Sequence, residues 1–204
     1  MPWITTATGR CMSLDLPHPR DVMPLDIAWH LAQINRFTGA ARRPYSVAEH
    51  SLLVSEIAER EMGLDVHGQF AALLHDAHEA YTNDLSSPAK QTIGQPWHQF
   101  EQVLETAVRQ AMATIASSAV HRDAIKRADL MALATERRDL LNREKAGRLP
   151  WPVLEGIEPV TWVDLAAPER EAMTWADWRD RFIDRLHELD FARNDAVFGA
   201  PVRA

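Results

Sequence analysis

The chain has 204 residues, a formal net charge of −7 and a single cysteine, Cys11. Its 46% hydrophobic and 25% charged residues are those of an ordinary globular protein. An internal disulfide is excluded, and the acidic balance argues against binding to a nucleic-acid polymer. Because no run approaches the roughly 18 apolar residues of a membrane span and the N-terminus lacks a secretory signal, we expect a cytoplasmic protein with no membrane partner.

Helical periodicity dominates the first half of the chain. The first expected helix covers 24–37, and the second covers 46–63 with Ser46 as its N-cap and Glu49 three residues later. A third helix is expected over 67–81. These segments together predict a helical bundle.

The second half continues the same pattern. We expect helices over 96–115, 118–147 and 167–192, separated before the last one by a proline-rich stretch, 148–168. That stretch should be irregular and should cover the bundle. The apolar residues expected to face inward from the first and last of these helices are Phe100, Val103, Leu104 and Ala107, and Trp175, Trp178, Phe182, Leu186 and Leu189.

No strand alternation of useful length and no internal repeat is visible in the sequence. The fold class expected is therefore all-α, with one domain over 1–204. Its motif-bearing core covers about 24–145, and 146–204 supply the cover segment and the C-terminal helix.

His50 lies on the apolar stripe of the second expected helix. Val47, Val54 and Ile57 occupy helical positions on the same side. Taken alone, such a residue is most simply a core histidine whose nitrogens bind backbone groups.

Further polar residues on apolar faces favour a metal site instead. On the third helix, His75 and Glu79 are four residues apart with Asp76 beside them, and Asp129 lies on the apolar face of 118–147. An unpaired buried carboxylate costs several kcal/mol, so metal ligation explains these positions well. For Asp129, an ion pair with an arginine is the alternative. Helical bundles build metal sites from inward-facing side chains of this kind.

Two imidazoles and two carboxylates define the chemistry of the expected ion. The set His50, His75, Asp76 and Asp129 suits Mn, Co, Fe, Ni or Zn better than Ca or Mg, which prefer shells of oxygen. We expect one or more divalent ions, with positions left open for water and a phosphate oxygen.

Four motifs occur in a fixed order along the chain. They are "INRF" (34–37), "SVAEHS" (46–51), "HDAHE" (75–79) and "DLSSPAK" (84–90), followed by Asp129. This series resembles the HD-domain phosphohydrolase superfamily, and more closely its 5′-deoxynucleotidase-like branch of bacteria and phages. The resemblance covers about 24–135 and implies an HD-type helical bundle with a metal-dependent hydrolytic activity.

The resemblance also implies roles for residues around the metal. Glu79 would orient or deprotonate the attacking water, and Asp84 would act as an acid toward the leaving 5′ oxygen or contact the sugar. Arg36 and Lys90 would bind phosphate. Phe37 would wall the sugar and base, although a plain core aromatic explains it equally well.

Deoxynucleotides are the substrates that the resemblance implies, and a homodimer is the expected assembly. The short segment 84–90, held by Pro88, favours a compact pocket for a deoxynucleoside 5′-monophosphate. A dNTP triphosphohydrolase is the alternative, and it would need further cations such as Arg43 or Lys126. For the basic pair Arg42–Arg43, which precedes Pro44, we expect either a solvated turn or a contact with phosphate. A non-catalytic nucleotide sensor is the alternative from another functional class.

Overall fold

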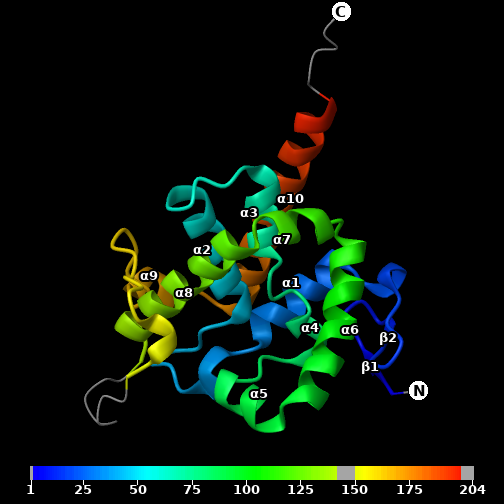
Figure 1. Cartoon of the computed structure of the whole chain (residues 1–204), viewed down its shortest axis with the longest axis horizontal. Coiled ribbons are helices and arrows are strands. Elements are labelled where there is room, and N and C mark those ends of the chain that lie inside the picture. Colours follow the sequence, from blue (N-terminus) through cyan, green and yellow to red (C-terminus); the bar gives the residue numbers. More distant parts are fainter. Residues whose placement is uncertain (1, 142–149, 199–204) are drawn as a thin grey trace, which may run out of the picture.

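The computed structural model describes residues 2–141 and 150–198, which form a helical bundle (Figure 1). This confirms the predicted all-α class. The helices of the described residues are α1 (Pro24–Gln33), α2 (Val47–Arg60), α3 (Val66–Leu73), α4 (Glu79–Thr82), α5 (Ser87–Ile93), α6 (Gln95–Ala111), α7 (Ile115–Val120), α8 (Arg122–Asp139), α9 (Pro168–Glu171) and α10 (Trp175–Phe198).

A small hairpin precedes the bundle, although no strand was predicted. Strands β1 (Trp3–Thr5) and β2 (Cys11–Ser13) pair antiparallel. Three residues are too few to show a period of two in the sequence. The backbone amide and hydroxyl of Thr8, in the turn, donate to the buried carboxylate of Asp26 on α1 at 2.7 and 2.9 Å, which joins the hairpin to the bundle.

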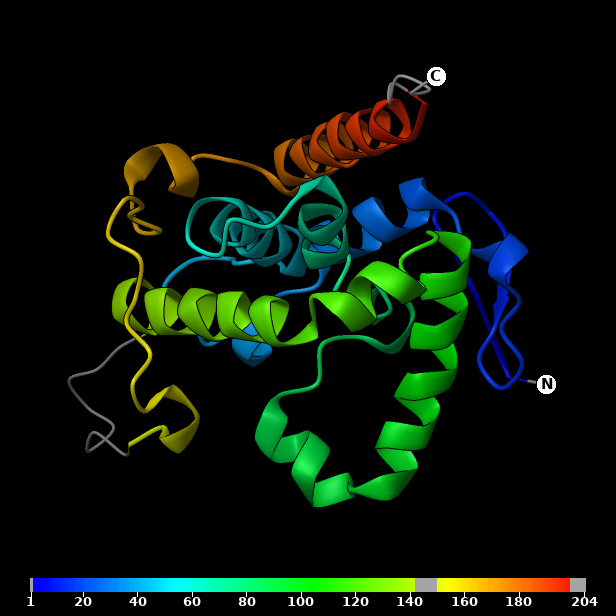
Figure 2. The same cartoon turned by 45° about the horizontal axis from the view of Figure 1, so that its top comes forward.

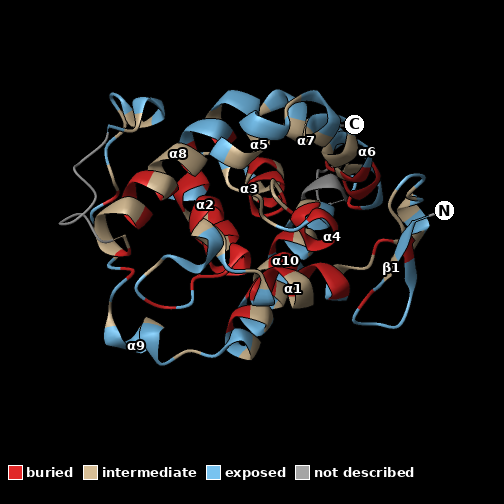
Figure 3. Cartoon of the chain, turned by 90° about the horizontal axis from the view of Figure 1, so that it is seen from below, coloured by how far each residue is buried: buried red, intermediate tan, exposed pale blue. Residues whose placement is uncertain are grey.

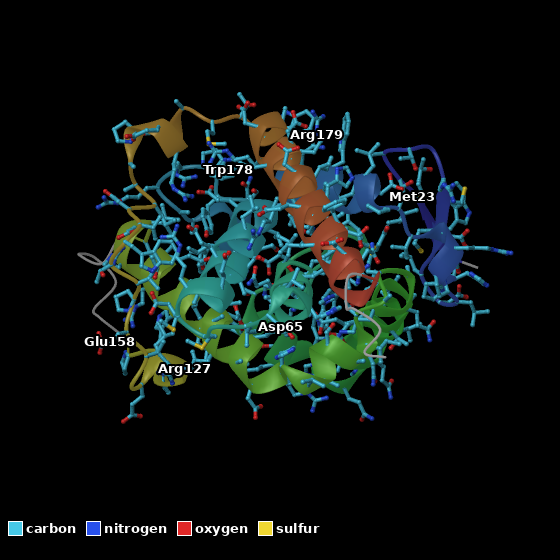
Figure 4. All side chains as sticks on the ribbon, turned by 90° about the horizontal axis from the view of Figure 1, so that it is seen from above. Met23, Asp65, Arg127, Glu158, Trp178 and Arg179 are labelled. Atoms are coloured by element: carbon cyan, nitrogen blue, oxygen red, sulfur yellow. The ribbon has the colours of Figure 1, made fainter. Side chains whose placement is uncertain are left out.

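Helix α2 is the centre of the fold. It packs against α1, α3, α8 and α10, and buried residues concentrate along it and on the facing sides of its neighbours (Figure 3). Helix α10 crosses the bundle with Trp178 near its start (Figure 4). Two apolar clusters meet at α2, since Val47 and Ala48 belong to one of them and Leu53, Val54 and Ile57 to the other.

The start of α2 is fixed by a cap and by a buried ion pair. The Ser46 hydroxyl accepts from the Glu49 amide at 3.1 Å, which confirms the predicted N-cap. The Arg43 guanidinium donates to both carboxylate oxygens of Glu49 at 2.7 Å and also to the carbonyl of Leu165. Arg170 reaches Glu49 at 2.8 Å. The prediction of a solvated turn or a phosphate contact at Arg43 is therefore wrong, because this side chain is buried.

Several predicted boundaries also need correction. The helix expected over 24–37 ends at Gln33, because Arg36 N donates to the Tyr45 carbonyl and Val47 N to the Ile34 carbonyl, both at 2.9 Å. This backbone pairing holds the chain alongside the segment that leads into α2, and Arg36–Gly39 forms a separate 3₁₀ turn.

Other departures lie in the second half. The segment 87–93, for which no helix was predicted, forms α5. The helix expected over 118–147 is divided into α7 and α8 around His121, α8 ends at Asp139, and 142–149 lie outside the described residues. Val103 and Trp175 are 42% and 41% exposed, so they do not face the core.

The described part of the predicted cover segment, from 150 onward, is irregular apart from a 3₁₀ turn at Pro152–Leu154. Val160 and Leu165 are buried against the second cluster, and Trp162 donates to the Glu61 carboxylate at 2.7 Å. Trp151 lies under the guanidinium of Arg137. None of the helices of the described residues is long and apolar enough to cross a membrane.

Removing the cation of the Arg43–Glu49 pair should destabilise the fold. Arg43→Met leaves the fully buried Glu49 with Arg170 alone, and we expect the free energy of unfolding in urea to fall by about 3 kcal/mol. The exposed Arg42 provides a matched control, and Arg42→Met should change stability by less than about 0.5 kcal/mol. Equal effects of the two substitutions would contradict a stabilising role for the buried pair.

Candidate metal centre

Four potential ligand atoms converge between α2, α8 and the turn after α3. His50 Nε2 lies 3.3 Å from His75 Nε2, 3.6 Å from Asp76 Oδ2 and 3.3 Å from Asp129 Oδ1. His75 Nε2 lies 3.0 Å from Asp76 Oδ2 and 3.9 Å from Asp129 Oδ1. All four residues predicted as ligands are thus brought together.

The donor types of all four residues suit a divalent transition ion, and the ligand atoms of three of them, His50, His75 and Asp76, are spaced as for a single ion. Metal–ligand bonds of about 2.1 Å place neighbouring ligand atoms about 3.0 to 3.4 Å apart in octahedral or tetrahedral shells. The ligand atoms of His50, His75 and Asp76 all lie within 4.8 Å of one another and could hold a metal ion. Asp129 Oδ1 approaches both imidazoles, while its Oδ2 accepts from Lys126 at 2.8 Å.

A break in the third predicted helix makes this convergence possible. The prediction of one helix over 67–81 is wrong: α3 ends at Leu73, turns occupy 74–78, and α4 begins at Glu79. Consecutive residues on an α-helix point in directions about 100° apart, so a regular helix would direct the side chains of His75 and Asp76 away from each other. In the turns, their side-chain atoms approach to 3.0 Å.

The two imidazoles are oriented from behind by acceptors. His50 Nδ1 donates to the Glu136 carboxylate at 2.6 Å, and His75 Nδ1 donates to the Ala72 carbonyl at 2.8 Å. Each bond selects the tautomer that leaves Nε2 free for a metal.

Glu136 is a site residue that sequence reasoning missed. It is fully buried, and besides His50 it accepts from the Tyr45 hydroxyl at 3.0 Å and from Arg36 at 3.2 Å. The signal was present, because Glu136 lies seven residues after Asp129 on the same face of α8.

The buried carboxylates give the centre a strong attraction for positive charge. Burial and the Arg36 guanidinium act to lower the pKa of His50, but the carboxylates of Glu136 and Asp129 outweigh them and raise it to about 9. Burial opposes ionisation of Asp129, yet the hydrogen bond with His50 and the charge of His75 lower its pKa. A centre that holds a proton on His50 so firmly is also one that would bind a cation.

Arg36 lies at the edge of this centre. Its guanidinium is 3.2 Å from Glu136 and 3.9 Å from Asp76, and its Nε is buried without a hydrogen-bond partner among the described residues. Phe37, which follows it, is half-buried against the second apolar cluster, and the Arg36 guanidinium lies 5.4 Å from its ring centroid. Phe37 and Thr38 adopt left-handed backbone angles, with φ of 56° and 54°. Such angles are rare in these residue types and are found at functional sites.

Two further carboxylates lie near the centre. Glu79 is 3% exposed, and its Oε2 has no hydrogen-bond partner among the described residues. Burial, together with the charges of Asp76 and Asp84, raises the pKa of Glu79 well above its usual range. Burial also raises the pKa of Asp84, against the effect of Arg36.

Lys90 joins α5 to two carboxylates. Its ammonium donates to Glu101 at 2.6 Å and to Glu79 at 3.3 Å. The buried His78 lies 3.3 Å from the same Glu101 oxygen. Hydrogen bonds from His78 and Lys90 overcome the effect of burial and lower the pKa of Glu101 to about 2.

Comparison with known proteins gives two relatives of similar length. The uncharacterized protein YfdR of Escherichia coli (strain K12) is 34% identical over 189 residues, which cover 93% of this chain and 98% of YfdR. The chain belongs to the family of YfdR. The uncharacterized protein RCAP_rcc00048 of Rhodobacter capsulatus is 35% identical over 162 residues, covering 74% of this chain and 82% of that protein. No family model matches the chain.

The hydrogen bond from His50 to Glu136 should strengthen metal binding. Glu136→Gln keeps the shape of the side chain but removes the charge behind the imidazole, so we expect the affinity for Mn²⁺ to fall about 10- to 100-fold in calorimetric titration of metal-stripped protein. His75→Ala and Asp76→Ala should abolish binding. Unchanged affinity in Glu136→Gln would contradict this role, and full metal content in Asp129→Ala would remove Asp129 from the ligand set.

Proposed function

We propose that the protein is a metal-dependent phosphohydrolase of the HD type. One observation carries the proposal. The Nε2 atoms of His50 and His75 lie 3.3 Å apart, and each is within 3.0–3.9 Å of a carboxylate oxygen of Asp76 and of Asp129. The four-motif resemblance supports the same reaction class. A divalent ion bound by these residues would activate water and neutralise charge on a phosphoryl group.

Glu79 would take the proton of the attacking water. Its Oε1 is engaged by Lys90, whereas its buried Oε2 is free of hydrogen bonds within the described part of the chain. A carboxylate with a raised pKa binds a proton more readily near neutral pH than an ordinary one does. The acceptor atom is therefore Oε2.

Arg36 and Asp84 would act on the substrate. The terminal nitrogens of Arg36 approach Glu136 and Asp76, and its Nε is buried with no hydrogen-bond partner within the described residues. We assign this unsatisfied donor to a phosphoryl oxygen. Asp84 has no side-chain hydrogen bond or ion pair within the described residues, and its raised pKa suits proton donation to the leaving 5′ oxygen.

The substrate we propose is a deoxynucleoside 5′-monophosphate. Arg43, one of the cations that a triphosphate would need, is buried and bound to Glu49 and the Leu165 carbonyl. Lys126 is bound to Asp129. With Arg43 withdrawn into the fold and Lys126 paired with Asp129, fewer cations are free for distal phosphates, which favours a substrate with one phosphoryl group.

If Glu79 takes part in the chemistry but does not ligate the metal, its substitution should lower turnover without lowering metal binding. Glu79→Gln should retain bound metal, measured by emission spectrometry, while kcat falls by about 10² or more because the proton acceptor is lost. A variant that lost metal in proportion to its activity would show that Glu79 is a ligand instead.

The products test the choice of substrate. With Mn²⁺ or Co²⁺, the protein should release inorganic phosphate from dAMP, dGMP or dTMP. Release of triphosphate from a dNTP, with the monophosphates inert, would overturn the choice in favour of a triphosphohydrolase. Nucleotide binding with no hydrolysis of any kind would favour a sensor.

A further inference from the structure

A second group of ligand-like atoms lies next to the metal centre. Ligand atoms of His78, Glu79 and Glu101 are within 4.8 Å of one another, as in a metal site. The Lys90 ammonium already lies among them, 2.6 Å from Glu101 and 3.3 Å from Glu79. A cation fixed to the chain therefore occupies the place that a second ion would take.

The helix that carries Lys90 does not itself fix the position of this ammonium. None of the residues of α5 is buried, and the helix extends away from the bundle before the chain returns through α6 (Figure 2). Gly94, between the two helices, has φ 71° and ψ −138°, backbone angles that favour glycine. The position of the Lys90 ammonium must therefore be fixed by the residues with which it pairs.

Glu101 is the stronger of those partners. It lies 16% exposed on α6, it is closer to the ammonium than Glu79 is, and the same oxygen also faces the buried His78 at 3.3 Å. An ammonium has three N–H donors. With Glu101 and Glu79 accepting two of them, one donor remains for a phosphoryl oxygen.

We propose that Glu101 is a positioning residue for the reaction. It holds Lys90 so that the ammonium engages one oxygen of Glu79, leaves the other oxygen free, and presents its remaining donor to the substrate phosphoryl group. This inference rests on the proposed function, since it deepens the account of the same site. Without Glu101, Lys90 would pair with Glu79 alone or turn toward solvent with α5.

The test is a double-substitution cycle with Glu101→Gln and Lys90→Met, assayed with dAMP and Mn²⁺. Glutamine keeps the size of the side chain and removes its charge. We expect Glu101→Gln to lower kcat about 10- to 100-fold with a smaller change in KM, as for a misplaced catalytic group. Because Glu101 acts through Lys90, the double variant should be no slower than Lys90→Met alone.

A matched control lies one turn further along α6. Glu105 is a partly exposed glutamate that pairs with Arg109, and Glu105→Gln should leave kcat unchanged. Metal content and melting temperature of each variant show that the protein is folded and loaded. In the metal-free proteins, the losses in melting temperature caused by Glu101→Gln and Lys90→Met should also be non-additive.

The outcomes separate this inference from the function on which it rests. A wild-type protein that hydrolyses no nucleotide overturns the proposed function and, with it, this role of Glu101. Suppose instead that the wild type is active. If Glu101→Gln then behaves like Glu105→Gln, or if its effect on kcat adds fully to that of Lys90→Met, the role of Glu101 is wrong and the proposed function stands.

Discussion

The buried carboxylate of Glu136 is the interaction on which the arrangement around His50 depends. It accepts from His50 at 2.6 Å, from Tyr45 at 3.0 Å and from Arg36 at 3.2 Å, and it is fully buried. A charge in that position is tolerable only because each of its oxygens is hydrogen-bonded. In return it fixes the ring of His50 and holds Arg36 at the edge of the same centre. In the proposed function, Glu136 would therefore link metal affinity to phosphate binding.

Two adjacent residues of α2, Glu49 and His50, make buried polar contacts on different sides of the helix. Glu49 is bound by Arg170 of α9 and by Arg43, which also donates to the Leu165 carbonyl of the cover segment. His50 faces the ligand cluster instead. Both residues are fully or almost fully buried, so rotation of α2 would unpair one of them. The cover segment consequently helps to fix the position of His50 in the ligand cluster.

Much of the fold and the ligand set could be predicted from the sequence. The spacing of apolar residues around His50 and around Asp129 predicted that both lie on inward-facing sides of helices. Ser46, as an N-cap, predicted the start of α2. The break after Leu73 could not be predicted, because 67–81 is apolar at helical spacing throughout and contains no proline or glycine beyond Gly68. Tertiary contacts of His75 and Asp76 there prevail over local propensity. Lys90 was assigned to phosphate alone, since its partner Glu101 lies on another helix and gives no local signal.

We propose that one divalent ion binds between α2, α8 and the turn after α3. The most direct measurement is anomalous X-ray diffraction from crystals grown with Mn²⁺. We predict one strong anomalous peak per chain, bonded to His50 Nε2, His75 Nε2, Asp76 and Asp129. The absence of a peak there, or a peak only among exposed acidic residues elsewhere, would contradict the account.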